Sequence, residues 1–364
     1  MKAKIIGSVA GVVVTAVAVI LGWYFLHQTD VKPVKQEVTT VEQTTKDPYA
    51  GKARSFLTGQ YRDKKIVKRR PFAMMYNNIQ NAIPQSGIGN ADILYEAPVE
   101  GGITRLMGVF EDFTKLKKMG SVRSCRIYYC RFALEWDAIY CHYGQSKYAK
   151  KFLKSDKIDN VCSWNGESAY YRVQNGKALE HTCFANGKKL VKAAKKLKYK
   201  LKYKKDYKPH FAFADIDQTV SMDGLKTKKA KRVDVGYNYN KPYYLFNKKD
   251  KQYYRYQYGQ KHIDDQKKKK KNQLKFKNII IQFVDATLYP DNKSLDMTLT
   301  GKGKGWYITD GKATKITWEK KKKNGRTTYR YKDGSDIVLN NGKTAIQMVL
   351  NEYKDNVKFS KKAK

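Results

Sequence analysis

The feature that most constrains this chain is an uncharged stretch of 22 residues near its N-terminus, from Ile5 to Leu26. Most of these residues are aliphatic, and a helix of this length, at about 1.5 Å per residue, spans a hydrocarbon core of roughly 30 Å. Water cannot satisfy backbone groups inside lipid, so such a stretch closes its own hydrogen bonds as a helix. The sequence therefore predicts one transmembrane helix within residues 1–28, acting as an uncleaved signal anchor.

The charges around the apolar stretch predict its orientation. Lys2 and Lys4 precede it, and no acidic residue occurs before Asp30. Because positive charges favour the cytoplasmic side, we expect a single-pass protein of the cell membrane with the bulk of the chain outside the cytoplasm. Two alternatives stay open. One is a cleaved signal peptide, for which Ala16-Val17-Ala18 has the right shape but lies inside the apolar stretch; the other is a buried helix of a soluble protein.

The strong positive charge limits the classes of partner. The net charge is +41, and the residues up to Gln60 contribute only +3, which leaves about +38 for the rest. Such a field attracts polyanions. Outside a bacterial membrane these are wall polymers and lipid head groups, so we expect an anionic wall polymer or another envelope protein as partner. Nucleic acid binding through the basic surface is a less favoured alternative. The simplest alternative is that the many lysines only keep the protein soluble. The sequence does not predict the oligomeric state.

The chain contains five cysteines, which are Cys125, Cys130, Cys141, Cys162 and Cys183. No C-x-x-C pair occurs, so a zinc or thioredoxin-type site is not favoured, and we expect neither a metal nor a cofactor. An exported location permits disulfides, but an odd number leaves at least one thiol unpaired within a monomer. If Cys125 and Cys130 shared a helix, their directions would differ by about 140°. We therefore expect buried free thiols.

The pattern along the chain predicts a tether followed by a mixed domain. Residues 29–65 are polar and have few large apolar groups, which is typical of a flexible tether. Residues 66–215 alternate apolar runs with stretches of helical periodicity, and Ser121 is a candidate helix cap, so we expect an α/β N-terminal domain. The expected strands are residues 72–76, 91–98, 103–110, 137–142 and 196–203, and the expected helices are residues 123–135 and 186–197.

The second half of the chain has a different sequence pattern. Short strands separated by Gly, Asp and Asn predict a smaller, mainly-β C-terminal domain over residues 232–354, after a linker at 216–231 and before a basic tail at 355–364. Eight tyrosines lie between Tyr237 and Tyr258. We expect them to pack in the core and across strands rather than to form a platform for bases or sugars.

Several short motifs occur in a specific order over about residues 66–352. They are Arg70-Pro71, Asn77-Asn78, Pro84-Gln85-Ser86-Gly87, Ala91 to Glu96, Glu100 to Arg105, Val122 to Arg126, Asp137 to Tyr140, His142, Gly144, Ser146, Asn278 to Val284, Leu295-Asp296, Gly301-Lys302-Gly303, Gly311-Lys312, Ile316-Thr317-Trp318 and Leu339 to Thr344. This ordered set resembles the YerB-like lipoproteins, a two-domain family of unknown function. The resemblance implies an exported, membrane-attached protein and supplies no established reaction.

The chain departs from that family pattern at two places. Members commonly carry a lipid-attachment cysteine after the apolar segment, whereas no cysteine precedes Cys125 here, so we expect the helix itself to be the anchor. Glu180-His181-Thr182 also stands where the family often has Pro-His-Asn. A role that depends on that asparagine does not carry over.

Polar residues near the ends of apolar strands are candidates for a ligand site. Glu100 lies beside a Gly-Gly turn, Arg105 lies within an apolar strand, and His142 follows another. Ligands of open α/β sheets bind outside the carboxyl ends of the strands, and arginine forks bind carboxylate or phosphate through two hydrogen bonds. We therefore predict an anionic-ligand site. Its expected residues are Arg105, Arg123, Ser124, Arg126, Ser146 and Arg172.

A second hypothesis makes the protein a wall-active hydrolase or lyase. Glu100 would act as general acid or base with His142 or His181 as its partner, which requires these groups within hydrogen-bond reach of a substrate. Ser146 lacks a G-x-S-x-G setting, so it is a weak candidate nucleophile. In a purely structural alternative, Glu100 and Arg105 form a buried ion pair, His142 is a core histidine and Ser124 only caps a helix. The sequence leaves open whether the protein is an enzyme.

Overall fold

The computed structural model describes residues 48–155, 157–266 and 272–362. The described residues from Tyr49 onward belong to one compact unit. The expected transmembrane helix at residues 1–28 lies outside the described residues. Within the described ranges, no helix combines the length and the apolar character needed to cross a membrane.

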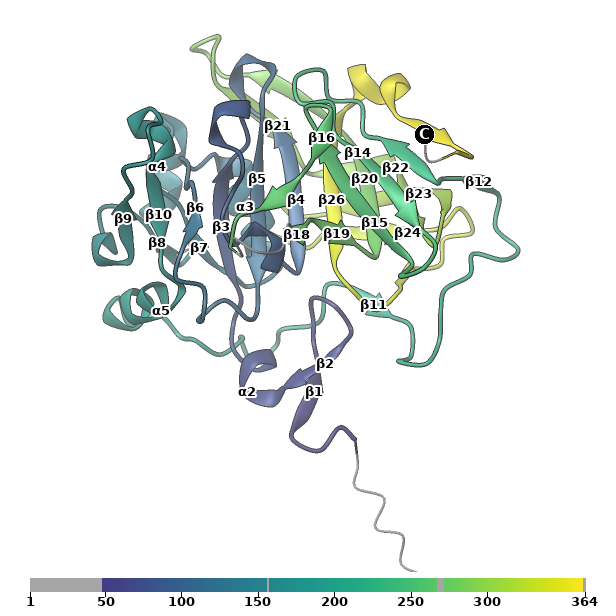
Figure 1. The fold of residues 1–364 in the computed structure, drawn as a ribbon, viewed down its shortest axis with the longest axis horizontal. Coiled ribbons are helices and arrows are strands. Elements are labelled where there is room, and N and C mark those ends of the chain that lie inside the picture. Colours follow the sequence, from purple (N-terminus) through teal and green to yellow (C-terminus); the bar gives the residue numbers. More distant parts are fainter. Residues whose placement is uncertain (1–47, 156, 267–271, 363–364) are drawn as a thin grey trace, which may run out of the picture. The chain divides into compact units, whose positions relative to one another are not determined.

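A twelve-stranded sheet runs through the whole unit (Figure 1). In spatial order its main path is β12 (Thr227–Lys229), β23 (Lys312–Lys320), β22 (Gly301–Thr309), β20 (Asn278–Leu288), β26 (Thr344–Leu350), β4 (Ile93–Pro98), β5 (Thr104–Phe110), β3 (Phe72–Asn77), β7 (Ile139–Cys141) and β8 (Asn160–Val161). Off this path, β21 (Leu295–Thr298) pairs with β20 and β24 (Thr328–Arg330) pairs with β23.

The two halves of the chain meet inside this sheet. Strand β26 of the second half pairs in parallel with β4 of the first, with Ala345 opposite Leu94 and Gln347 opposite Glu96. The hydroxyl of Tyr237 reinforces the junction, because it lies 3.0 Å from each of the backbone oxygens of Glu96 and Met348. A continuous ladder of backbone hydrogen bonds therefore joins the halves. The domain limits that we expect at residues 215 and 232 stay predictions.

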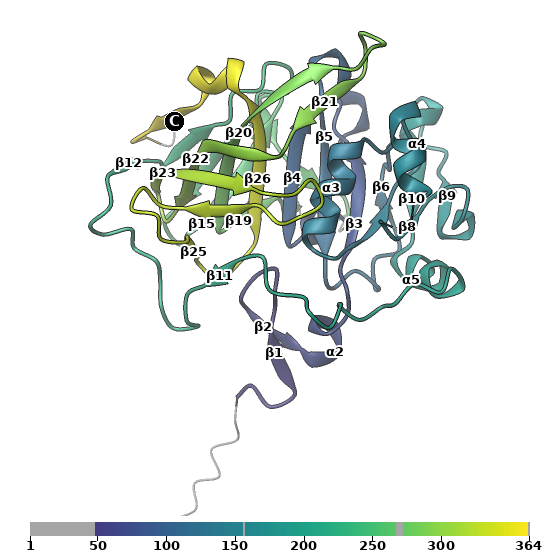
Figure 2. The ribbon, with the colours of Figure 1, turned by 180° about the vertical axis from the view of Figure 1, so that it is seen from behind.

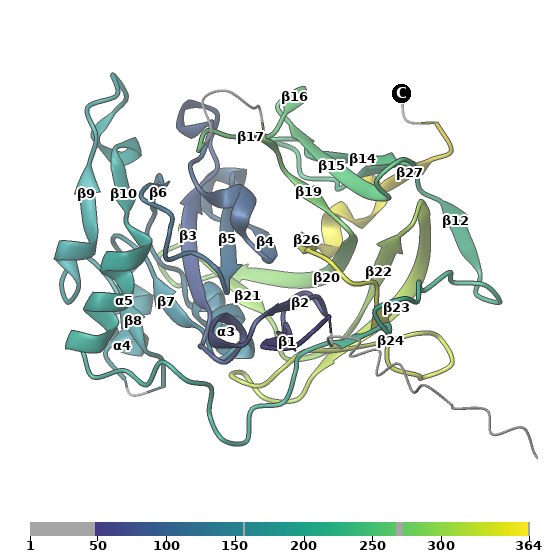
Figure 3. The same ribbon diagram turned by 60° about the horizontal axis from the view of Figure 1, so that its bottom comes forward.

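Smaller sheets lie around this central one. A six-stranded sheet contains β13 (Arg232–Asp234), β14 (Tyr243–Asn247), β15 (Gln252–Gln257), β16 (Gln260–Lys261), β19 (Lys275–Phe276) and β27 (Lys358–Ser360). A three-stranded sheet contains β6 (Met119–Gly120), β9 (Tyr170–Arg172) and β10 (Cys183–Ala185), and Figure 3 shows it at the edge beside β3. The two-stranded pairs are β1 (Lys52–Arg54) with β2 (Tyr61–Asp63), β11 (Ala212–Phe213) with β25 (Val338–Leu339), and β17 (Ile263–Asp264) with β18 (Asn272–Gln273).

Helices are few and short in the described residues. They are α2 (Lys64–Val67), α3 (Ile127–Glu135), α4 (Lys147–Leu153) and α5 (Gly187–Lys196), together with short 3₁₀ helices at Gln80–Ala82, Ile88–Asn90, Glu100–Gly102, Glu167–Ala169, Leu179–His181 and Asn351–Asn356. The predicted fold class, an α/β domain plus a smaller mainly-β domain, is therefore wrong for the described residues, and the transmembrane helix expected before these domains lies outside them. The described chain is mostly β-sheet, because other sheets rather than layers of helices cover much of the central one.

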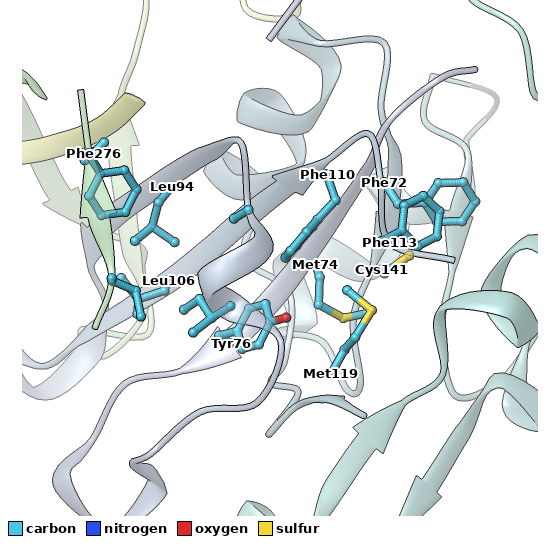
Figure 4. Close-up of a cluster of buried hydrophobic side chains, with 14 of the residues drawn as sticks. Phe72, Met74, Tyr76, Leu94, Leu106, Phe110, Phe113, Met119, Cys141 and Phe276 are labelled. Atoms are coloured by element: carbon cyan, nitrogen blue, oxygen red, sulfur yellow. The ribbon is translucent and has the colours of Figure 1, made fainter. Parts of the chain in front are cut away.

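The strand periodicity explains how the central sheet is buried on both faces. Along β3, Phe72, Met74 and Tyr76 enter one hydrophobic cluster, which Figure 4 shows with Phe110 and Met119, whereas Ala73 and Met75 enter the other. Successive side chains of a strand point to opposite faces, so a run without polar residues suits a strand covered on both sides. Helix α3 covers the second face, as the view from behind shows (Figure 2).

The aromatic runs of the second half pack as expected. Burial alternates along β15, where Tyr253 is fully buried. On the neighbouring strand β14, Tyr244 is fully buried, and Tyr243 stacks on Tyr256 across the strand pair with ring centroids 4.8 Å apart. The prediction of core and cross-strand packing is confirmed for these residues.

Two local predictions are wrong. No strand forms over residues 196–203; α5 ends at Lys196, and only an isolated bridge between Arg69 and Lys202 follows. Ser121 is not a helix cap, because α3 begins after Arg126, which makes no side-chain capping bond. Alternating Lys with Leu or Tyr in a lysine-rich chain is therefore a weak strand signal.

Candidate functional site

Three arginines, Arg105, Arg123 and Arg126, form what we call the arginine cluster. Arg105 lies on β5, opposite Asn77 of β3. Arg123 and Arg126 belong to the loop between β6 and α3. This loop lies beside the end of β3, where Asn77 N donates a backbone hydrogen bond to Ser121 O. The guanidinium of Arg105 donates to the backbone oxygen of Ser124 at 2.7 Å. The loop and the strand therefore hold each other in place.

Glu100 is the carboxylate partner of Arg126. It lies in the turn between β4 and β5, and its two oxygens accept hydrogen bonds from Arg126 Nε at 2.7 and 2.9 Å and from Nη2 at 2.7 Å. Partial burial opposes ionisation of Glu100, but the hydrogen bonds and the charge of Arg126 outweigh it and lower the pKa of the carboxyl. Glu100 is thus ion-paired with Arg126, and the pair with Arg105 that the structural alternative expected does not form among the described residues.

Arg105 is not ion-paired with any carboxylate of the described residues. Its side chain is buried, with 6 % of its surface exposed, and in the described part of the chain no carboxylate lies within ion-pair distance of it. Burial, together with the positive charges of Arg126 and Arg123, lowers the pKa of Arg105 to about 10, and the charge of Glu100 opposes this shift only in part. A guanidinium at neutral pH still carries its charge, so the fold maintains a buried cation beside two others at a net electrostatic cost.

A second chain of contacts leads from Arg123 to the sheet. Arg123 Nη1 lies 3.2 Å from the Glu180 carboxylate, whose other oxygen lies 3.3 Å from Nε2 of His181. On its other side, Nδ1 of His181 accepts from the Asn77 amide at 2.7 Å. Burial is the main cause that lowers the pKa of His181, with Glu180 opposing it. His181 is therefore best described as a neutral bridge whose Nε2 hydrogen faces Glu180.

The structure does not bring His142 together with Glu100. His142 is fully buried just after β7, its Nδ1 hydrogen is donated to the Gly144 oxygen at 2.8 Å, and its ring stacks on Tyr140. Burial lowers its pKa to about 4. No contact between His142 and Glu100 occurs among the described residues. The catalytic roles expected for Glu100, His142 and His181 stay predictions.

The remaining candidates have local partners. Ser146 caps α4 by accepting from the backbone nitrogen of Ala149 at 3.3 Å. Arg172 is exposed on β9 and donates to the Leu179 oxygen at 2.6 Å. Ser124 is half-buried against Gly144, where an added β-carbon would lie 2.6 Å from the serine hydroxyl oxygen. Of the ligand-binding residues expected from the sequence, the structure gathers Arg105, Arg123, Ser124 and Arg126.

A buried polar network between the two halves was not foreseen from the sequence. Glu96 and Arg255, both without exposed side-chain surface, form an ion pair of 2.6 Å. The carboxylate also accepts from Thr104 and Asn240 at 2.7 Å each. Arg255 contacts His262, which in turn lies 2.7 Å from Gln85. The only local signal was a glutamate inside an otherwise apolar strand, and its partner lies 159 positions away.

The two halves each match a family model. Residues 57–200 match "Protein of unknown function (DUF3048) N-terminal domain", and residues 233–346 match "Protein of unknown function (DUF3048) C-terminal domain". The chain belongs to this family of proteins of unknown function, and its resemblance to the YerB-like proteins is confirmed.

Two comparisons place the chain close to one relative in particular. It is 32% identical over 304 residues to the protein of Bacillus subtilis (strain 168) named "Putative lipoprotein YerB", covering 82% of this chain and 87% of the relative. The crystal structure of the YerB protein from Bacillus subtilis matches with a TM-score of 0.72 and 29% identity, over 85% of this chain and 99% of that one.

Proposed function

We propose that this chain is a cell-envelope protein whose folded part lies outside the cytoplasm and binds an anionic envelope component at the arginine cluster. The observation that carries this proposal is Arg105, which is buried, charged and without a carboxylate partner in the described chain. Buried charges are normally paired, because an unpaired one is costly. An anion bound from outside would supply the missing partner.

The balance of charge around Arg105 supports an anionic ligand. Three guanidinium groups face two carboxylates, those of Glu100 and Glu180. One more negative charge would neutralise the group.

Guanidinium chemistry defines the class of ligand. An arginine fork matches carboxylate or phosphate oxygens and is bidentate where the geometry allows. Polymers of the envelope carry these groups in repeats, and the net charge of +41 would raise their local concentration by long-range attraction. The expected ligand is therefore a phosphate or carboxylate group of a wall polymer, recognised by the cluster and attracted by the whole surface.

The relationship to the Bacillus subtilis protein supports the location. That relative is named "Putative lipoprotein YerB", and lipoproteins are attached to membranes. By the same family relationship we place this chain at the envelope. The nature of its attachment does not enter the binding proposal, which rests on residues of the described unit.

The test is co-sedimentation of the full-length chain, kept in detergent, with purified cell wall. The matched variants are Arg105→Gln and Arg330→Gln. Both remove one positive charge, but Arg330 lies on β24, far from the cluster in sequence, and is paired with Glu319 and Asp336. We expect Arg105→Gln to weaken binding by about tenfold or more, since a hydrogen bond to a charged group contributes roughly 1.5–3 kcal/mol, and Arg330→Gln to bind like the wild type.

Three outcomes would contradict the proposal. Equal loss in both variants would make the binding a general effect of charge. Equal binding to wall and to DNA, abolished by moderate salt, would indicate non-specific electrostatics. Release of soluble wall fragments that stops in Glu100→Gln would favour a wall-active enzyme instead.

A further inference from the structure

Cys125 and Cys130 face each other in the structure. Their Sγ atoms lie 3.2 Å apart, and both side chains are fully buried. Cys125 precedes α3, which begins at Ile127, whereas Cys130 lies within that helix. Because Cys125 lies outside the helix, the angular separation that helical geometry would impose does not apply to this pair.

The other three cysteines provide a comparison within the same fold. Cys141, Cys162 and Cys183 are also buried, but among the described residues none of them makes a sulfur–sulfur contact of hydrogen-bonding length. Two thiols are weak donors and weak acceptors, so the contact between Cys125 and Cys130 contributes little as a hydrogen bond. A disulfide, with its sulfurs about 2.05 Å apart, requires a closer approach of only about 1 Å.

We propose that Cys125 and Cys130 are joined by an intramolecular disulfide in the mature protein. The proposal uses the extracytoplasmic location given under the proposed function, because disulfides persist in oxidising compartments; it does not depend on anion binding. The oxidant is an external disulfide, either a small molecule or an oxidoreductase. One cysteine thiolate attacks this external disulfide, which gives a mixed disulfide and releases the first external thiolate. The second cysteine then attacks the mixed disulfide at the first cysteine and releases the second external thiolate. The external disulfide takes up two electrons and two protons and leaves as two thiols.

The burial of the pair indicates when the bond forms. Burial raises the pKa of Cys130 well above its ordinary value, and contact with Cys125 raises it further. The thiolate is the reactive form, so the folded, reduced chain should react slowly, whereas a chain that folds in the presence of oxidant should form the bond readily. Once closed, the bond would tie the loop that carries Arg123 and Arg126 to α3.

The experiment is peptide mapping of the full-length chain without reduction. One sample is refolded in a glutathione redox buffer, and the other is taken from cells with an alkylating agent added before lysis. Trypsin cleaves after Arg123, Arg126 and Arg131, so the pair falls on two different peptides. We expect the tripeptide 124–126 linked to the pentapeptide 127–131, two hydrogen atoms lighter than the separate peptides, and Cys141, Cys162 and Cys183 alkylated.

The two samples separate the two possible failures. If both peptides are alkylated and unlinked in both samples, or if another pair is linked, the inference is overturned. If the pair is linked in buffer but free in cells, the disulfide of the mature protein is overturned, whereas the anion-binding proposal, which does not use this bond, is unaffected.

Stability gives a second readout with matched variants. Closing this short loop should raise the midpoint of thermal unfolding of the wild type by about 5 °C relative to the reduced form. The shift should vanish in Cys125→Ser and persist in Cys183→Ser. Persistence of the shift in Cys125→Ser would contradict the assignment.

Discussion

Two arginines, Arg255 and Arg105, are buried in the same unit, but of the two only Arg255 forms an ion pair with a carboxylate of the described residues. Arg255 is fully buried, is paired with Glu96 at 2.6 Å, and lies in a network that includes Asn240, His262 and Gln85. Arg105 is almost as buried and donates one hydrogen bond to a backbone oxygen, and its charged neighbours are Arg123, Arg126 and, without an ion-pair contact, Glu100.

This difference distinguishes a buried charge that stabilises the fold from a buried charge that we propose to serve binding. A buried charge whose partners all come from the protein fixes the packing of the strands that carry it. A buried charge that the protein leaves without a partner costs stability, and such groups are concentrated at binding and catalytic sites. By this criterion the network around Glu96 joins the two halves of the chain, and the arginine cluster is the proposed binding site.

The largest expected effect concerns the network. Arg255→Met should lower the free energy of unfolding by about 3–5 kcal/mol, because it leaves the Glu96 carboxylate buried without its cation. Denaturant unfolding measures the change. The double variant Glu96→Gln, Arg255→Met should recover part of the loss, since it removes the uncompensated charge. A loss below about 1 kcal/mol in the single variant would show that Arg255 is not structural.

An intermediate effect is expected for the ion pair within the arginine cluster. Arg126→Gln should cost about 1–2 kcal/mol, because Glu100 and Arg126 expose 24% and 15% of their side chains and the pair is only partly screened. The pKa of Glu100 is lowered in the folded wild type. Its contribution to stability is therefore present above the pKa of the unfolded chain and lost as the pH falls through the lower folded pKa.

Unfolding at a series of pH values tests this sign. The difference in stability between the wild type and Arg126→Gln should shrink as the pH falls from about 5 toward 3. A difference that stays constant over this range would contradict the role of Arg126 as the group that keeps Glu100 ionised.

The smallest expected effect on stability belongs to Arg105. Arg105→Gln removes one hydrogen bond to the Ser124 oxygen but also relieves burial of a cation beside two others. We expect the free energy of unfolding to change by less than about 1 kcal/mol in either direction, as at sites where function rather than folding maintains a residue. A loss as large as that of Arg255→Met would show that Arg105 stabilises the fold, and the contrast between the two arginines would no longer hold.

The sequence predicted the strands better than their assembly. Apolar runs at 72–76 and 103–110 correspond to β3 and β5, and the helical run at 186–197 corresponds to α5. The parallel pairing of β26 with β4 could not be predicted, because the two strands lie far apart in the chain and no local pattern specifies their register. The α/β expectation was wrong for the same reason, since local alternation does not show what covers a sheet.

The sequence predicted which residues belong to the candidate site but not which of them form ion pairs with one another. Polar residues beside or within apolar strands led to Glu100 and Arg105, and those near an expected helix start led to Arg123 and Arg126. Nothing in the sequence distinguishes Arg126 from Arg105 as the partner of Glu100. The contact of Cys125 with Cys130 was missed because the helix was expected to begin at residue 123, whereas it begins at Ile127. The position of a helix boundary thus decided whether the thiols could meet.

The most direct test of the central claim is a calorimetric titration of glycerol phosphate, a small phosphate probe, into the full-length chain and into Arg105→Gln. We predict saturable binding at one site in the wild type and its loss in the variant, with both proteins equally stable. Identical titration curves for the two proteins, or heat without saturation in the wild type, would contradict the claim that the arginine cluster is an anion-binding site.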